Sequence, residues 1–125
     1  MKRIMLDRLL VAFLVLTASI GTAQPVSIVI LGDMPYGPPK EVYAPYERLI
    51  EAVNAAESDL VIHVGDTKSG GAPCTDRLLA EQRAYLDRFD FPTLYTPGDN
   101  EWTDCHRQSA GGHDPRERLA HIRAT

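Results

Sequence analysis

Three aspartates, each directly after a glycine, are the residues of this sequence best suited to chemistry. They are Asp33, Asp66 and Asp99, spaced 33 residues apart. Each pair follows a short apolar run, and the third continues into Asn100 and Glu101. Clustered carboxylates repel one another and are costly to desolvate, so they usually gather around a cation. If the runs are parallel strands of one sheet, their carboxyl ends place these oxygen ligands at the edge where α/β sheets bind ligands.

Three apolar runs predict the strands that carry these residues. They span residues 26–31, 60–64 and 91–96, and the first is nearly continuous in hydrophobic side chains, as a strand covered on both faces should be. Three parallel strands with helices alone would nevertheless leave one edge or face of the sheet uncovered. His63 stands alone in the second run and is interpreted as a satisfied sheet residue. The 33-residue spacing is also the ankyrin period, but these runs are β-type and no Thr-Pro-Leu-His pattern is present. The spacing therefore indicates one strand–loop–helix unit per repeat.

Helices are predicted between and after the strands. Apolar residues at helical spacing predict one helix beginning near Pro45 and a second beginning at Thr75 or Asp76, either of which can cap it. Asp114 as a cap and Pro115 in the first turn predict a third. The expected fold class is therefore α/β, with three mainly parallel strands and helices packed against them.

The N-terminus has the features of a secretory signal peptide. A positive start is followed by an apolar stretch from Leu9 to Leu16 and by small residues up to Ala23. We therefore expect residues 1–23 to be a signal peptide and residues 24–125 to be the mature domain, secreted or periplasmic and without a membrane span. A membrane anchor is the alternative, but the uncharged run is at the short end for a span.

The predicted mature part is acidic. The whole chain has a formal charge of −4, and removing residues 1–23 leaves 10 basic and 16 acidic residues, a charge of −6. A nucleic-acid backbone favours a basic face, so no such partner is expected. The negative surplus fits a metal site, whose ligands are themselves negative.

Cys74 and Cys105 are the two cysteines of the chain. In an exported protein an even pair indicates one disulfide, which would stabilise the fold by about 3–4 kcal/mol in the chain-entropy model. Two free thiols or a soft metal site are the alternatives, and the absence of Cys-x-x-Cys spacing disfavours the metal site.

The order of these motifs resembles the calcineurin-like metallophosphoesterase family. That family carries Asp-x-His, Gly-Asp and Gly-Asn-His-Asp/Glu at successive strand tips, and later a lone His and a Gly-His-x-His. Here the order is Gly-Asp, Gly-Asp and Pro-Gly-Asp-Asn-Glu, over roughly residues 27–102. The later motifs are absent, so the resemblance covers the front half of a family domain. It implies that residues 24–125 are a truncated domain, the N-terminal part of a four-layer α/β/β/α sandwich.

The resemblance also implies a reaction and a role for each residue. It implies a phosphoester substrate attacked at phosphorus by a hydroxide that two divalent metal ions share, with Mn, Fe or Zn as the metal class. Asp33 matches the first-metal aspartate, and Asp66 matches the carboxylate that bridges both metals. Asp99 falls at the second-metal asparagine, and Asn100 falls at the phosphate-facing histidine. A shift of one residue would instead make Asn100 the metal ligand, and both registers stay open.

Two positions depart from the family pattern. Pro35 stands where Asp-x-His has its histidine, which removes a nitrogen ligand, and Asn100 does not donate a proton as an imidazolium does. His106 is a candidate substitute, although it is more simply interpreted as a loop histidine. These departures leave a second hypothesis, a non-catalytic member of the same fold that binds a phosphorylated ligand or a partner. A receiver-type phosphotransferase is disfavoured, because its early Asp-Asp pair is missing.

Overall fold

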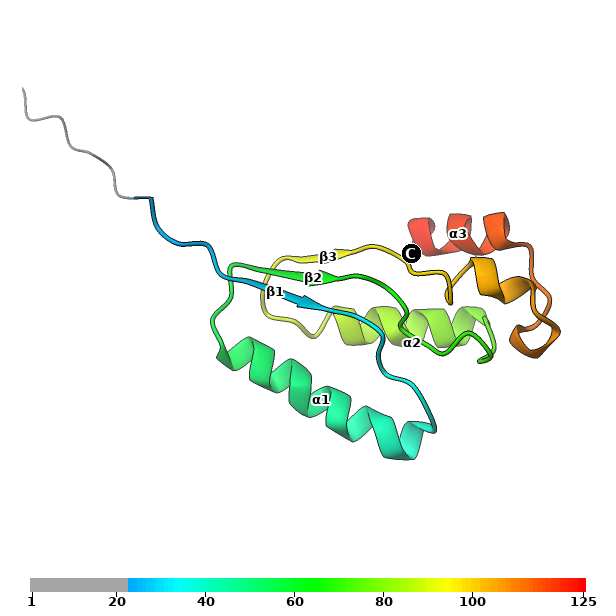
Figure 1. The fold of residues 1–125 in the computed structure, drawn as a ribbon, viewed down its shortest axis with the longest axis horizontal. Coiled ribbons are helices and arrows are strands. Elements are labelled where there is room, and N and C mark those ends of the chain that lie inside the picture. The colour runs from blue at the N-terminus through cyan, green and yellow to red at the C-terminus, as the bar shows by residue number, and fades with distance from the viewer. Residues whose placement is uncertain (1–22) are drawn as a thin grey trace, which may run out of the picture.

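The structure is a computed structural model that describes residues 23–125. The predicted signal peptide, residues 1–23, lies outside this range except for its last residue. Figure 1 shows six main elements in the order β1 (Ile28–Leu31), α1 (Pro39–Ala55), β2 (Leu60–His63), α2 (Asp76–Leu86), β3 (Thr93–Tyr95) and α3 (Pro115–Ala124). Two short 3-10 helices, η1 (Thr103–His106) and η2 (Gln108–Ala110), lie between β3 and α3. Within residues 23–125, no helix has both the length and the hydrophobicity that crossing a membrane requires.

The strands form one parallel sheet in the order β1-β2-β3, which confirms the α/β class and the parallel arrangement. Ile30 pairs with Ile62, and Ile62 pairs with Leu94, so these three residues form one row across the sheet. The strands are shorter than the apolar runs that predicted them, because the ladder extends only where neighbouring strands overlap. Parallel order brings the carboxyl ends of all three strands to one edge.

One face of the sheet is covered by helices. In Figure 1, α1 and α2 lie on the same side of the sheet, as two successive crossovers of the same hand require. The apolar stripe predicted for α1 is buried there and packs with inward-facing strand residues. The buried core consists of Leu31, Tyr46, Ile50, Val53, Val61, Leu86 and Phe89.

The opposite face carries apolar side chains that the described residues leave exposed. Ile30 is 65% exposed and Leu94 is 58% exposed, and Ile28 and Val64 are nearly half exposed. The prediction that the first strand is covered on both faces is therefore wrong within residues 23–125, whereas the expectation of an uncovered edge or face agrees with the exposed side chains. The continuous hydrophobicity of the strands reflects one buried face and one open apolar face.

Helix α1 begins earlier than predicted. It starts at Pro39, after an extended Pro38, and Pro45 lies inside it. Proline suits the first turn because its missing N–H has no intrahelical partner there. Pro45 lies in the interior of the helix and lacks the N–H that would donate a helical hydrogen bond there. Because proline is more common in a first turn than in a helix interior, the sequence wrongly predicts the start of α1 near Pro45. The other caps are as predicted: the Leu78 N–H donates to the Thr75 hydroxyl at 3.2 Å, and the Asp114 carboxylate caps α3.

Candidate functional site

The loops that follow the three strands contact one another at the carboxyl edge of the sheet. The Asp33 N–H donates to the Gly65 carbonyl at 3.1 Å, and the Asn100 N–H donates to Asp66 Oδ1 at 3.2 Å. Asp33 and Asp66 both adopt the left-handed backbone conformation, with φ of 58° and 56°. Aspartate tolerates this conformation better than most residues, and backbone strain of this kind is often found at functional sites.

Tyr36 joins these loops through its hydroxyl. The hydroxyl lies 3.5 Å from Asp33 Oδ1 and accepts a hydrogen bond of 2.8 Å from Asn100 Nδ2. Burial raises the pKa of the Tyr36 phenol, and the charges of Asp66 and Asp33 raise this pKa further. Two of the predicted site residues, Asp33 and Asn100, therefore contact this phenol, and Asn100 in turn contacts Asp66. Sequence reasoning missed Tyr36, although it follows the first Gly-Asp pair in a loop rich in proline and glycine.

Asp99 is placed differently from the other two aspartates. Its side chain is exposed, and its backbone carbonyl accepts hydrogen bonds from the Trp102 and Asp104 N–H groups and the Thr103 hydroxyl. Within the described residues, no hydrogen bond connects its carboxylate to Asp66 or Tyr36. The structure thus brings Asn100 to the other two aspartates, and Asp99 instead turns the chain into η1.

The tips of β2 and β3 make a tight contact, which we call the β2–β3 junction (residues 65–67 and 98–101). A β-carbon added to Gly98 would overlap Asp66 Oδ1. A β-carbon on Gly65, whose φ is 91°, would overlap the Gly98 backbone. Both glycines are therefore required by close approach, which is the physical reason that glycine precedes Asp66 and Asp99.

Glu101 lies inside the junction and does not face the strand edge as a ligand. The side chain is fully buried, and Oε1 accepts hydrogen bonds from both the N–H and the hydroxyl of Thr67, the latter at 2.8 Å. Oε2 is buried and has no hydrogen-bond partner in the described part of the chain. This placement disfavours Glu101 as a metal ligand at the strand tips.

Lys68 is a buried cation that the sequence did not single out. Its ammonium donates to the carbonyls of Ser69 and Ala72 at 3.1 and 3.0 Å. Burial lowers the pKa of Lys68, and the nearby carboxylates of Glu101, Asp104 and Asp66 oppose this shift. The positive charge therefore balances the carboxylates that gather behind the strand tips.

His63 and His106, the two histidines considered in the sequence analysis, have different surroundings. His63 is fully buried, and its Nδ1 accepts the Gly65 N–H at 3.2 Å. Its Nε2 has no hydrogen-bond partner among residues 23–125, so the interpretation as a satisfied residue holds for one nitrogen only. Burial lowers the pKa of His63, and the charge of Asp33 opposes this shift. His106 is exposed, with Nδ1 2.6 Å from the Thr103 carbonyl, as expected of a loop histidine.

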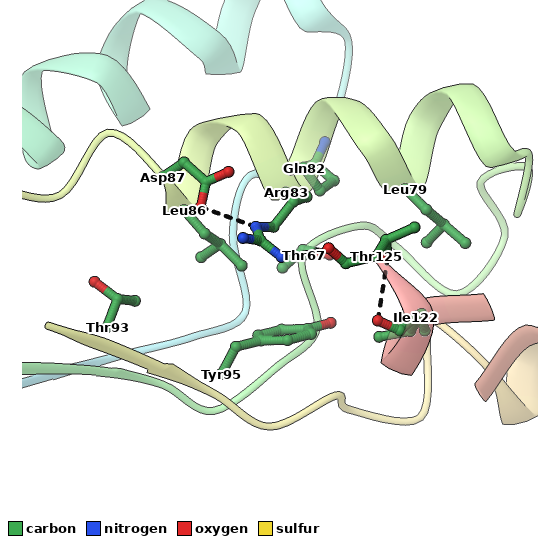
Figure 2. Close-up of a pocket in the computed structure, with 10 residues that line it drawn as sticks. All are labelled: Thr67, Leu79, Gln82, Arg83, Leu86, Asp87, Thr93, Tyr95, Ile122 and Thr125. Atoms are coloured by element: carbon green, nitrogen blue, oxygen red, sulfur yellow. Dashed lines mark hydrogen bonds and ion pairs between the residues drawn. The ribbon is translucent and has the colours of Figure 1, made fainter. Parts of the chain in front are cut away.

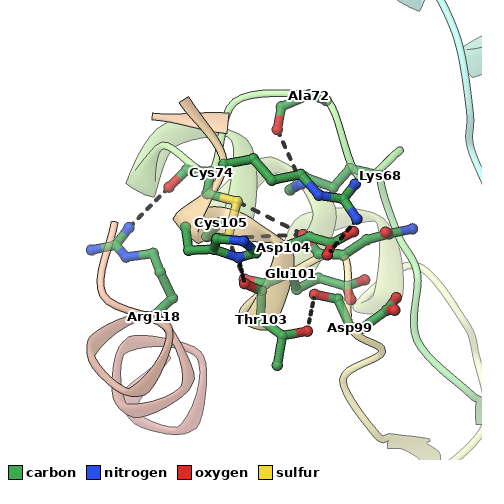
Figure 3. The surroundings of a disulfide bond; sticks show 12 residues. Lys68, Ala72, Cys74, Asp99, Glu101, Thr103, Asp104, Cys105 and Arg118 are labelled. Carbon is green, nitrogen blue, oxygen red and sulfur yellow. Dashed lines mark hydrogen bonds and ion pairs between the residues drawn. A yellow bond between two sulfur atoms is a disulfide. The ribbon is translucent and has the colours of Figure 1, made fainter. Parts of the chain in front are cut away.

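A disulfide joins Cys74 to Cys105, as predicted, and both residues are fully buried. It ties the loop after β2 to η1, and so lies directly behind the β2–β3 junction (Figure 3). Arg118 of α3 donates to the Cys74 carbonyl at 3.0 Å and pairs with Asp76 at 2.5 Å. Arg118 is the buried residue of α3, so this helix is held against the disulfide by polar contacts.

Three cavities lie along the described residues, and one of about 260 Å³ lies between the loop after β1, including Tyr36, and α1. Another, of about 200 Å³, lies between α2, β3 and the end of α3, with Thr67 and Tyr95 on its wall (Figure 2), and none of the predicted site residues line it. The third, of about 520 Å³, lies between the loops after β1 and β2 and the beginnings of α1 and α2. Residues next to Tyr36 and Asp66 line this third cavity: Pro35, Gly37, Lys68 and Ser69.

The donor atoms at the strand tips suit a hard divalent cation. Asp33 and Asp66 offer carboxylate oxygens, and Asn100 offers an amide oxygen once its side chain rotates to exchange Oδ1 with Nδ2. Within the described range, no group of three His, Cys, Asp or Glu side chains is arranged to hold a metal ion.

No protein-family model, curated protein or solved structure matches this chain.

Proposed function

We propose that this chain carries part of the active centre of a metal-dependent phosphoester hydrolase. The observation that supports the proposal is a chain of contacts across the three strand tips: the Tyr36 hydroxyl contacts Asp33 and accepts from the Asn100 side chain, and the Asn100 N–H donates to Asp66. The order of the strand-tip motifs, which resembles the calcineurin-like phosphoesterases, favours this chemistry over other uses of clustered carboxylates.

In this proposal each residue has a defined task. Asp33 and Asp66 hold divalent cations, which lower the pKa of a water and polarise phosphoryl oxygens when bound. The resemblance to the calcineurin-like family implies two cations. The second cation would need ligands in addition to the side chains at the strand tips. Asn100 orients the phosphoryl group or completes the ligand set, and its amide is held in place by Tyr36.

The cavity of about 520 Å³ gives the substrate a place for its organic part. Its volume falls within the range of small-molecule sites. Its walls are mainly apolar, with Lys68 on the side of the strand tips. We therefore propose a phosphorylated small molecule as the substrate, without specifying its organic group.

Export is part of the same proposal. A disulfide-bonded cysteine pair is consistent with an extracellular or periplasmic location. The predicted signal peptide would supply the route.

The test measures metal binding and hydrolysis in the same protein. Trp102 is the single tryptophan and lies two residues beyond Asn100, so Mn²⁺ bound at the strand tips is expected to quench its fluorescence. Asp66→Asn should abolish both saturable quenching and Mn²⁺-dependent hydrolysis of an aryl phosphate. The control is Asp90→Asn, an exposed residue in the loop before β3 at the other end of the sheet. Retention of both signals in Asp66→Asn would overturn the proposal.

The same titration decides the register between Asp99 and Asn100. Because Asp99 lies apart from Asp66 and Tyr36, Asp99→Asn is expected to keep Mn²⁺ binding. A loss of quenching equal to that of Asp66→Asn would instead assign the metal ligand to Asp99.

A second candidate function is binding without turnover. Pro35 and Asn100 replace two histidines of the family pattern, and the described residues hold no cluster of three ionisable ligands. This candidate is favoured if the purified protein contains no Mn, Fe or Zn, cannot be loaded with them, and still binds an aryl phosphate.

A further inference from the structure

Glu101 has an environment that is costly for a carboxylate. The side chain is fully buried, and Oε2 has no hydrogen-bond partner in the part of the chain that the structure describes. A carboxylate buried with an unpaired oxygen loses free energy relative to water. The other oxygen accepts both side-chain and backbone donors of Thr67, a residue that is itself buried. These hydrogen bonds hold the Glu101 side chain against Thr67. Thr67 directly follows Asp66 in the sequence, so the contact also acts on the position of Asp66.

Two neighbouring contacts connect the same two loops. Asp66 accepts the N–H of Asn100, and one residue further along each loop Thr67 donates to Glu101. Because these pairs are adjacent in both loops, the second contact fixes the separation and rotation of the first. The close approach of Gly98 to Asp66 leaves no room for a side chain between them.

We propose that Glu101 is a positioning residue: by holding Thr67, it keeps Asp66 against Asn100 in the arrangement that binds a divalent cation. This inference rests on the proposed function, because the cation is what the arrangement serves. Figure 3 shows Glu101 among the residues that surround the disulfide, together with Asp99 and Asp104.

The negative charge of Glu101 and its hydrogen-bond acceptor oxygen have separate effects: the charge balances Lys68, and the oxygen holds Thr67. The buried ammonium of Lys68 lies in the field of Glu101. Glu101→Gln keeps an oxygen that can accept from Thr67 but removes the charge opposite Lys68. This variant is therefore expected to lose stability while it keeps the position of Asp66. Glu101→Ala removes both the charge and the acceptor.

The experiment compares these two variants in the full chain by Mn²⁺ titration of Trp102 fluorescence and by urea denaturation. Glu101→Ala is expected to weaken Mn²⁺ binding by about 10–100-fold, the usual effect of removing a partner behind a metal ligand. Glu101→Gln should stay within about threefold of the original protein, although both variants unfold at lower urea concentration. The matched control is Val53→Ala, which opens a cavity under α1 and should lower stability without changing Mn²⁺ affinity.

Amide hydrogen exchange gives a readout that needs no metal. Glu101→Ala should accelerate exchange of the Asn100 N–H, which bonds to Asp66 and not to Glu101. Glu101→Gln and Val53→Ala should leave that exchange close to the original rate. Unchanged Asn100 exchange in Glu101→Ala, or equal losses of Mn²⁺ affinity in all three variants, would overturn the inference. If the original protein binds no Mn²⁺, the proposed function fails, and the exchange rates alone still decide whether Glu101 positions Asp66.

Discussion

The β2–β3 junction and the tip of β1 contribute to the same edge of the sheet but are held in different ways. The junction has buried side chains, two glycines in close contact and a disulfide behind it. Asp33 and Tyr36 at the β1 tip are exposed and reach the junction through one backbone hydrogen bond and the Tyr36 hydroxyl. The difference indicates that Asp66 and Asn100 are preorganised, whereas Asp33 can adjust when a ligand binds.

The largest effect is expected from removing the disulfide that supports the junction. The bond closes a loop with a sequence separation of 31, so Cys74→Ala with Cys105→Ala should lower the free energy of unfolding by about 3–4 kcal/mol. Urea denaturation measures this loss. Reduction of the original protein with dithiothreitol is the control and should give a similar shift, because the chain has no other cysteine. An unchanged unfolding midpoint would show that the junction is held by its other contacts.

A smaller effect is expected from crowding the junction. In Gly98→Ala the new methyl group overlaps Asp66 Oδ1, so either the loop or the aspartate must move. Overpacking of this kind costs about 1–3 kcal/mol in the free energy of unfolding. The same substitution at Gly71, where a β-carbon meets nothing within 4 Å, is the matched control and should be nearly neutral. Equal stabilities of the two variants in urea would contradict a tight junction.

The smallest effect is expected at the β1 tip. Tyr36→Phe removes the hydroxyl that accepts from Asn100 and approaches Asp33. Because Tyr36 is 39% exposed, the loss in unfolding free energy should be below about 1 kcal/mol. The Asn100 side-chain amide signals in an NMR spectrum should nevertheless shift. Tyr85→Phe on α2 is the control and should leave those signals unchanged, whereas a loss of several kcal/mol in Tyr36→Phe would show that the β1 tip is as firmly held as the junction.

Much of the fold followed from local patterns. Apolar runs located all three strands, and the caps at Thr75 and Asp114 located two helices, because these signals act over a few residues. The start of α1 was missed, since a proline suits a first turn whether it stands at residue 39 or residue 45. The sequence predicted that an edge or a face of the sheet would be uncovered but did not decide between them, because hydrophobicity in a strand does not report what packs on it.

The site was predicted in part. Gly-Asp pairs after strands located Asp33 and Asp66 correctly at one edge, since parallel strands must end together. The choice between Asp99 and Asn100 depends on which side chain turns toward the Tyr36 hydroxyl, and one residue of shift reverses that direction. Tyr36 and Lys68 gave no signal of their own, because the groups that make them notable, Asn100 for Tyr36 and the Glu101 carboxylate for Lys68, belong to a loop more than 30 residues away.

The sequence by itself determined the parallel α/β order, the disulfide partners and the presence of acidic groups at the strand ends, because spacing and residue type suffice for these. The tertiary structure alone decided which of those groups meet, that Glu101 turns inward to Thr67, and that one apolar face of the sheet stays open in the described residues. Those outcomes depend on the close approach of distant loops, where a few tenths of an ångström decide whether side chains fit.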